Sequence, residues 1–326
     1  MPALVTGASG FLGGRLAEVL AREGEQVTVL ARPNADLRHL SGSKVRVVRG
    51  GLTDREPIVD ALRGATHIYH CAAASTDWAS MEVYLESNVK GTEVLLAAAR
   101  EAPQLERFVH VSTTDVYGYP VIPCNETGAL RDVGLPYNQT KILGEKAVWR
   151  VAREAGLPVT VLRPATIYGP RGKAFVTDIA DLLRKREMAH IGGGGTTGGF
   201  LYVDNAVDAL IAAARSSATL GQAYNLTDET GVLWSEYVGS LAEGLGCKPP
   251  WIDIPYDAAM VIARVMEFPY RWLKGRPLLT RHAVALLGRD QEYPCGKARV
   301  EFDFVSRVSF EEGMDRSVAW VKDLPH

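Results

Sequence analysis

Apolar residues recur along this chain in two patterns. Short apolar runs, which are typical of buried strands, alternate with longer stretches that place apolar residues on one face of a helix. The expected strands cover residues 3–6, 26–31, 45–49, 67–71, 108–112, 159–163 and 223–226, and the expected helices cover 13–23, 81–100, 137–154 and 202–214. This alternation predicts an α/β protein with a doubly wound parallel sheet between two layers of helices.

A glycine motif follows the first expected strand and opens the first expected helix. Gly7, Gly10 and Gly13 are spaced three residues apart. The first glycine permits a tight turn, the second lets a pyrophosphate approach the backbone, and the third permits close helix–strand packing. The helix N-terminus also offers free N–H groups to phosphates. An ordinary glycine-rich turn is the alternative, but this context favours dinucleotide binding on a Rossmann sheet.

The last third of the chain has a different pattern. Beyond Pro249 the apolar residues mostly recur at helical spacing, and prolines interrupt them. We therefore expect a smaller, mainly helical C-terminal substrate domain beside the Rossmann domain. The expected boundaries assign residues 1–167 and 200–228 to dinucleotide binding, and residues 168–199 and 229–326 to substrate binding.

The end of the second expected strand bears on the choice of dinucleotide. An acidic residue at this point would bind the adenosine ribose of NAD. Here the strand is followed by Arg32, which, helped by Arg38, can bind a 2′-phosphate through its guanidinium fork. The alternative is that Arg32 is solvated and that Asp36 reaches the ribose. The sequence thus favours NADP, with NAD as the other choice.

Composition and charge argue against several classes of protein. The chain has 326 residues, with 36 Lys+Arg and 38 Asp+Glu, and its formal net charge of −2 gives no general attraction to nucleic acid. The four cysteines are far apart and the seven histidines show no metal-ligand spacing, so we expect reduced thiols and no metal. We expect neither a signal peptide nor a membrane-spanning stretch, and a cytoplasmic location.

Two segments carry candidate catalytic groups. Tyr137 and Lys141 are four residues apart in an expected helix and therefore share one face. A lysine ammonium favours the phenolate and lowers the tyrosine pKa, so the pair could shuttle a proton during hydride transfer at a carbinol carbon. Thr113 and Thr114 follow an expected strand, where their hydroxyls could hold a substrate oxygen or simply cap a turn.

These segments together resemble the extended short-chain dehydrogenases/reductases over nearly the whole chain. The resemblance rests on the glycine motif, on residues 70–73, 88–92, 112–118 and 162–170, and on the Tyr137/Lys141 pair. It implies that Tyr137 is the general acid/base and that Lys141 lowers its pKa and binds the nicotinamide ribose. It further implies that Thr113 binds the substrate and that Asn88 supports the active-site helix.

The residue patterns and the resemblance together give the full set of expected contacts. The cofactor contacts would be Gly7, Ser9, Gly10, Phe11, Leu12, Gly13, Arg32, Arg38, Gly51, Leu52, Cys71, Ala72, Ala73, Tyr137, Lys141, Pro164, Ala165, Thr166 and Ile167. The substrate contacts would be Thr113, Thr114, Trp78 and Tyr168.

Two departures from the family pattern matter. The third strand ends in Gly50-Gly51-Leu52, where relatives often have Gly-Asp-Leu, so the adenine contact of that aspartate is in doubt. Thr113 is followed by Thr114-Asp115, where dehydratases have Asp-Glu. Dehydration needs that extra acid/base pair, so dehydratase chemistry is not expected.

The C-terminal half indicates the branch of the family. Sugar-nucleotide enzymes commonly carry a phosphate-binding arginine shortly before a Tyr-Val-Asp-like segment, whereas Gly198 and Gly199 precede Tyr202 here, and Arg171 or Arg276 would have to compensate. Residues 274–281, 297–304 and 308–313 look like the 3β-hydroxysteroid dehydrogenase branch, which includes sterol-4-carboxylate decarboxylating dehydrogenases and bacterial reductases of long-chain 2-alkyl-3-keto acids. Several side chains could line an apolar pocket or belong to the core: Trp78, Met81, Tyr84, Met260, Met266, Phe268, Tyr270 and Trp272.

The sequence thus predicts an NADP-preferring oxidoreductase that interconverts a secondary alcohol and a ketone on a lipophilic substrate, either sterol-like or a long-chain 3-keto acid. A nucleotide-sugar 4-epimerase and a catalytically silent dinucleotide sensor or scaffold are the alternatives. Residues 258–287 mix apolar runs with basic residues, which fits peripheral membrane contact or a solvated basic face. By analogy with relatives, we expect a homodimer formed through residues 81–100 and 137–154.

Overall fold

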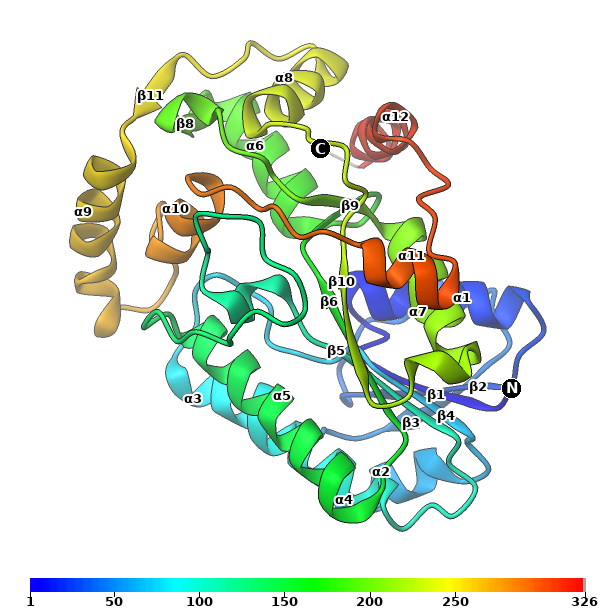
Figure 1. Cartoon of the computed structure of the whole chain (residues 1–326). Helices are drawn as coiled ribbons and strands as arrows, with labels where there is room; N and C mark the ends of the chain where they lie inside the picture. The colour runs from blue at the N-terminus through cyan, green and yellow to red at the C-terminus, as the bar shows by residue number, and fades with distance from the viewer. Residues whose placement is uncertain (325–326) are drawn as a thin grey trace.

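Seven parallel strands form the central sheet of this computed structural model, which describes residues 1–324 apart from the Arg271 side chain. The strands are β1 (Ala3–Thr6), β2 (Val27–Ala31), β3 (Val45–Arg49), β4 (His67–His70), β5 (Arg107–Val111), β6 (Val159–Pro164) and β10 (Gln222–Leu226). Their spatial order is β10-β6-β5-β4-β1-β2-β3 (Figure 1). The doubly wound Rossmann sheet is confirmed, and each expected strand lies within one residue of its predicted ends. The order reverses between β1 and β4, which places a ligand-binding crevice there.

Helices cover both faces of the sheet (Figure 1). One face packs against α1 (Phe11–Arg22), α7 (Val203–Arg215) and α11 (Gly296–Phe302), through residues such as Val5, Leu20 and Leu210. The other face packs against α2 (Arg55–Leu62), α4 (Gly91–Ala99) and α5 (Pro136–Ala155), through residues such as Leu4, Ile58 and Val148. Strands buried on both faces explain why their sequences read as continuous apolar runs.

The expected helix over 81–100 contains a structural irregularity. It begins as α3 (Met81–Tyr84), continues as a π-helical turn over Leu85–Lys90, and ends as α4. Gly144 of α5 lies against this turn, where a Cβ atom would come within 2.5 Å of the Asn88 carbonyl oxygen. The glycine therefore allows α5 and the π-helical turn to approach closely. Such turns occur frequently at functional sites.

The remaining elements lie beyond the carboxyl ends of the strands or along the helical layer. Two small parallel sheets pair β7 (Thr166–Tyr168) with β9 (Phe200–Tyr202), and β8 (Ala189–Ile191) with β11 (Ile252–Ile254). The helices are α6 (Asp178–Lys185), α8 (Trp234–Leu245), α9 (Tyr256–Glu267), α10 (Arg281–Leu287) and α12 (Phe310–Lys322). The helical pattern predicted beyond Pro249 is present, and β11 was not predicted. The exact domain boundaries stay a prediction.

Across residues 1–324, none of the helices combines the length and the apolar character that crossing a bilayer requires.

Candidate active site

The predicted phosphate cradle connects β1 to α1. Gly7 has a φ angle of 75°, and a Cβ atom there would lie 2.7 Å from the Ala72 backbone nitrogen. A Cβ at Gly13 would lie 2.6 Å from the Gly7 carbonyl oxygen. The α1 N-terminus begins after Gly10 without a side-chain cap, so its first N–H groups remain available to a ligand. This geometry fits a bound pyrophosphate, and it places Ser9, Phe11 and Leu12 at the same turn.

The two predicted arginines occupy different environments. Arg32 lies exposed at the end of β2, where its carbonyl accepts a hydrogen bond from Arg49. Arg38 instead forms a forked ion pair with Asp36, with the closest contact at 2.7 Å. This pair is exposed and therefore weakly stabilising. Arg32 is thus accessible to a 2′-phosphate, whereas Arg38 is occupied by the carboxylate that was the alternative ribose ligand.

Other predicted cofactor contacts follow β3, β4 and β6 at the same edge of the sheet. The Gly51 N–H donates to the Asp54 carboxylate at 2.7 Å, and Leu52 lies against Gly91. The half-buried residues after β4 are Cys71, Ala72 and Ala73. Pro164 ends β6, Ala165 follows it, and Thr166 and Ile167 begin β7. The Thr166 hydroxyl is buried without a hydrogen-bond partner among the described residues, which leaves a polar atom for a ligand.

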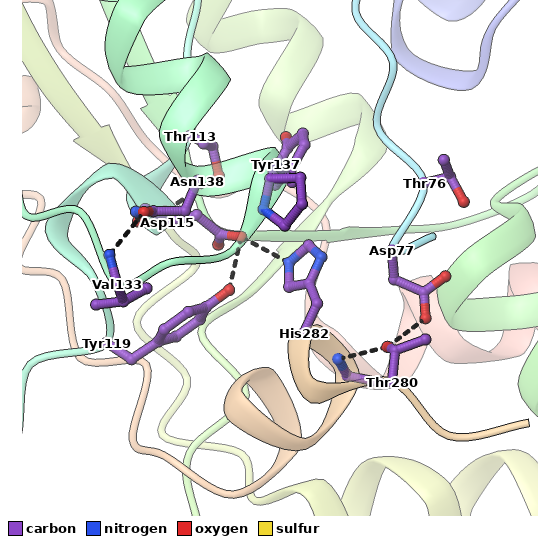
Figure 2. Close-up of polar contacts among 12 residues, drawn as sticks. Thr76, Asp77, Thr113, Asp115, Tyr119, Val133, Tyr137, Asn138, Thr280 and His282 are labelled. Carbon is purple, nitrogen blue, oxygen red and sulfur yellow. Dashed lines mark hydrogen bonds and ion pairs between the residues drawn. The ribbon is translucent and has the colours of Figure 1, made fainter. Parts of the chain in front are cut away.

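Tyr137 lies at the start of α5 between two aromatic rings. Its ring stacks on His282 of α10, with centroids 5.2 Å apart and an interplanar angle of 22°. On another side lies the Tyr84 ring, with centroids 6.3 Å apart. Figure 2 shows Thr113 and His282 beside Tyr137, although these residues come from different elements. The structure thus brings the predicted Thr113 and Tyr137 together.

The surroundings of Tyr137 determine its protonation state. Burial raises the pKa of Tyr137 well above its ordinary value, the Asp115 carboxylate raises it further, and a hydrogen bond with Thr113 opposes the rise. The Lys141 ammonium is buried and donates to the Val111 carbonyl at 2.8 Å. The net direction is opposite to the lowering of the Tyr137 pKa that the sequence led us to expect. These side chains alone therefore keep Tyr137 protonated at neutral pH.

Lys141 and Asn88 are both buried on the inner side of α5. Burial lowers the pKa of Lys141 to about 8, while the Glu145 carboxylate opposes this change. The Asn88 amide accepts from the Ala74 N–H at 2.7 Å and donates to the Thr140 hydroxyl at 3.1 Å. Asn88 therefore ties the loop after β4 to α5, and its role in supporting the active-site helix stays a prediction.

The predicted substrate contacts are only partly brought together. Thr114 is buried next to Thr113, and its hydroxyl interacts with Tyr293. Trp78 is half-buried in the loop after β4. Tyr168 does not reach the site, because its ring is fully buried against Tyr202 and Tyr237. The expectation that Tyr168 contacts substrate is therefore corrected to a core role.

Sequence reasoning missed a group of residues around Tyr137. Asp115 accepts hydrogen bonds through one carboxylate oxygen from His282 Nε2 at 2.9 Å and from the Tyr119 hydroxyl at 2.8 Å (Figure 2). Asp77, after β4, accepts from the Thr280 hydroxyl at 2.8 Å and pairs with Arg276 at 2.7 Å. Asp115 and His282 are 167 residues apart, so no local pattern could pair them.

This site is that of a nicotinamide-dependent dehydrogenase: a glycine cradle for a dinucleotide, with a tyrosine and a lysine on one helix beside it. A family model described as "NAD dependent epimerase/dehydratase family" matches residues 3–227. The chain therefore belongs to this family, within the extended short-chain dehydrogenases/reductases, and its cofactor is a nicotinamide dinucleotide.

Three curated relatives cover nearly the whole chain. A 4-hydroxy-2-methyl-3-oxo-4-farnesyl-3,4-dihydroquinoline-1-oxide ketoreductase of Stigmatella aurantiaca is 32% identical, over 97% of this chain and 95% of the relative. A 2-alkyl-3-oxoalkanoate reductase of Stenotrophomonas maltophilia is 32% identical, over 97% and 98%. A decarboxylating sterol-4-alpha-carboxylate 3-dehydrogenase of Mus musculus is 28% identical, over 96% and 89%. These matches confirm the branch of the family that the sequence predicted.

The fold is also that of a solved structure from another branch. The UDP-glucuronic acid 4-epimerase of Bacillus cereus in complex with NAD has a TM-score of 0.79 at 20% identity, and the match covers 99% of both chains. At this identity the similarity defines the fold alone.

Proposed function

We propose that the protein reduces a ketone to a secondary alcohol, or catalyses the reverse oxidation, on a lipophilic substrate, with NADP as the preferred cofactor. The observation that carries this proposal is Tyr137, which is enclosed beside Thr113 at the edge of the sheet that holds the glycine cradle. Lys141 lies one helical turn away on the same helix. Proton donor, oxygen ligand and dinucleotide cradle are the parts that this reaction needs.

The chain's own residues have separate tasks in this reaction. When bound, a nicotinamide supplies the hydride for the carbonyl carbon or accepts it from the carbinol carbon. Tyr137 gives its hydroxyl proton to the carbonyl oxygen in reduction and takes it back in oxidation. Thr113 holds that oxygen, and Lys141 is placed to hold the ribose and the tyrosine. Burial favours the protonated form of Tyr137, which is the form that donates a proton in reduction.

The names of the three relatives support a shared substrate feature. Each names an oxygen-bearing group on the carbon next to the reacting carbon: a 4-hydroxyl next to a 3-oxo group, a carboxylate on C2 next to the 3-oxo group of an oxoalkanoate, and a 4-carboxylate next to a sterol C3. Two also name a long or polycyclic apolar part, the farnesyl group and the sterol. We therefore propose a sterol-like substrate or a long-chain 3-oxo acid.

The 4-epimerase alternative has less support. A sugar diphosphate needs cationic partners, and Arg171 and Arg276 were the candidates. Arg171 forms an ion pair with Glu18 at 2.7 Å, and Arg276 is paired with Asp77. A silent sensor or scaffold is also disfavoured, because Tyr137, Lys141 and Thr113 are all in place.

Cofactor absorbance with two substrate classes tests the proposal. With NADPH and a long-chain 2-alkyl-3-oxo acid, we expect net oxidation of the cofactor. With UDP-glucose we expect neither net oxidation nor conversion to UDP-galactose. Formation of UDP-galactose without turnover of the oxo acid would replace the proposal with the epimerase.

We predict that Arg32→Ala discriminates between the two cofactors. A guanidinium bond to a 2′-phosphate is lost only with NADPH, so NADPH affinity is expected to fall about 10–100-fold. NADH affinity is expected to stay within a few-fold. Arg38→Ala is the matched control, since its guanidinium is bound to Asp36. Fluorescence titration with both cofactors measures the effect, and an equal loss for NADH would remove Arg32 as the phosphate ligand.

We also propose a homodimer and a cytoplasmic location. Exposed apolar side chains line the α3–α5 layer, including Val83, Leu85 and Leu143. A second copy could cover them about a two-fold axis, as the sequence predicted. Light scattering on the purified protein tests the dimer, and a monomer mass would reject it.

The four free cysteines suit a reducing compartment, which supports the proposed cytoplasmic location.

A peripheral membrane contact is proposed for α9 and the turn after it. Val261, Val265 and Trp272 are exposed there, with the basic Arg264 and Lys274 nearby. Phe268 packs edge-on against Trp272, on the outer surface instead of in the apolar pocket considered from the sequence. Apolar side chains flanked by basic ones suit an anionic bilayer surface. Cosedimentation with anionic vesicles tests this membrane contact. If the protein does not cosediment, the surface of α9 is a solvated basic face.

A further inference from the structure

His282 has one ring nitrogen fixed by the protein and one without a partner. Nε2 contacts Asp115 Oδ2 at 2.9 Å. A carboxylate oxygen accepts hydrogen bonds, so the proton on this side belongs to Nε2. Nδ1 is buried and makes no hydrogen bond with any residue in the described part of the chain. Buried polar atoms are nearly always paired, so this nitrogen points to a ligand.

The position of His282 is set from two neighbouring loops of the Rossmann sheet. Asp115, after β5, holds the imidazole and also accepts from the Tyr119 hydroxyl at 2.8 Å. Asp77, after β4, accepts from the Thr280 hydroxyl, and Thr280 caps α10 by accepting from the Ala283 N–H at 3.0 Å (Figure 2). The helix that carries His282, α10, is thus fixed to the loops after β4 and β5.

The imidazole that carries the free nitrogen lies against the ring of Tyr137. The imidazole stacks on the Tyr137 ring with centroids 5.2 Å apart, and it is only slightly exposed. A substrate whose carbonyl oxygen is bound to the Tyr137 hydroxyl therefore extends past the edge of this imidazole. The atoms nearest to Nδ1 would belong to the carbon next to the reacting carbon and to the groups it carries.

We propose that His282, held by Asp115, is a specificity-determining residue that uses Nδ1 to bind an oxygen of a group carried by the carbon next to the reacting carbon, such as the carboxylate of a 3-oxo acid. This inference rests on the proposed ketone reduction and deepens it. An imidazole with a proton on each nitrogen donates from Nε2 to Asp115 and from Nδ1 to a carboxylate of the substrate. Ketones without such a group leave Nδ1 unpaired and lose this interaction.

The test compares a long-chain 3-oxo acid with the matched methyl ketone that lacks the carboxylate. For the unaltered protein, kcat/KM is expected to favour the acid by about 10–100-fold, the size of a hydrogen bond to a charged group. His282→Gln keeps an amide where Nε2 contacts Asp115 but has no group at Nδ1. We expect this variant to lose the preference for the acid while its kcat/KM for the plain ketone changes only a few-fold.

Tyr119→Phe is the matched control, because it removes the other donor to Asp115 and leaves His282 in place. It is expected to retain the preference for the acid, whereas a purely structural role of the Asp115 cluster would affect both variants and both substrates alike. Equal kcat/KM for acid and ketone in the unaltered protein, or a preference retained by His282→Gln, would overturn the inference. Reduction of neither compound by the unaltered protein would instead remove the proposed function on which it rests.

Discussion

Tyr137→Phe is expected to reduce kcat for ketone reduction by about 10²–10⁴-fold, the contribution typical of a positioned acid or base. Phenylalanine keeps the ring that packs between Tyr84 and His282 and removes only the hydroxyl. Steady-state kinetics with saturating NADPH measure the loss. Cofactor affinity, measured by fluorescence titration, is expected to stay within a few-fold.

The control for this variant is Tyr256→Phe, which removes a phenol hydroxyl from α9, where the ring lies under Arg289. Its kcat is expected to match that of the unaltered protein. Turnover of Tyr137→Phe within ten-fold of the unaltered protein would show that another group delivers the proton, and the role assigned to Tyr137 would be rejected.

Glu145→Ala is expected to lower the free energy of unfolding by about 3–5 kcal/mol, the cost of leaving one partner of a buried ion pair alone. Glu145 is fully buried on α5, and its carboxylate accepts from Arg163 at 2.5 Å and from the Ser112 hydroxyl at 2.6 Å. The Trp149 indole donates to it at 3.0 Å. Without Glu145, the Arg163 guanidinium would be buried with no carboxylate to balance its charge. Urea unfolding followed by circular dichroism measures the change.

Glu93→Ala provides the comparison, because Glu93 pairs with Arg150 at 3.0 Å in a half-exposed position. Exposed pairs contribute at most about 1 kcal/mol, so this variant is expected to be nearly as stable as the unaltered protein. Similar losses for both variants would mean that the Glu145–Arg163 pair has no special role in holding α5 against β5 and β6.

The sheet could be predicted from sequence because its strands are buried on both faces. Continuous apolar runs such as those around Leu4, Ile68 and Phe108 have few other interpretations, and glycines at fixed spacing define the turn after β1. Helix irregularities were less predictable. The π-helical turn over Leu85–Lys90 keeps the apolar spacing of an ordinary helix closely enough to be read as one.

The cofactor side of the site was predictable for a similar reason, since its residues follow strands whose ends share one edge. The substrate side was not. His282 and Thr280 reach the site from a C-terminal helix, and only the folded chain shows that they contact Asp115 and Asp77. Tyr168 was expected at the site but lies in the core, because a tyrosine after β6 can belong equally to a site or to an aromatic core. Long-range packing decides such positions, and no local pattern encodes it.

Isotope transfer from the cofactor shows whether the hydride reaches the substrate and stays there. The protein would be given NADPH that carries deuterium at the transferred position, together with a long-chain 2-alkyl-3-oxo acid. Mass spectrometry would then locate the label. We predict one deuterium on the new carbinol carbon for each NADPH oxidised. Deuterium that remains on the cofactor, while a UDP-sugar supplied in the same reaction is inverted at its 4-position, would contradict net reduction of a ketone and identify an epimerase.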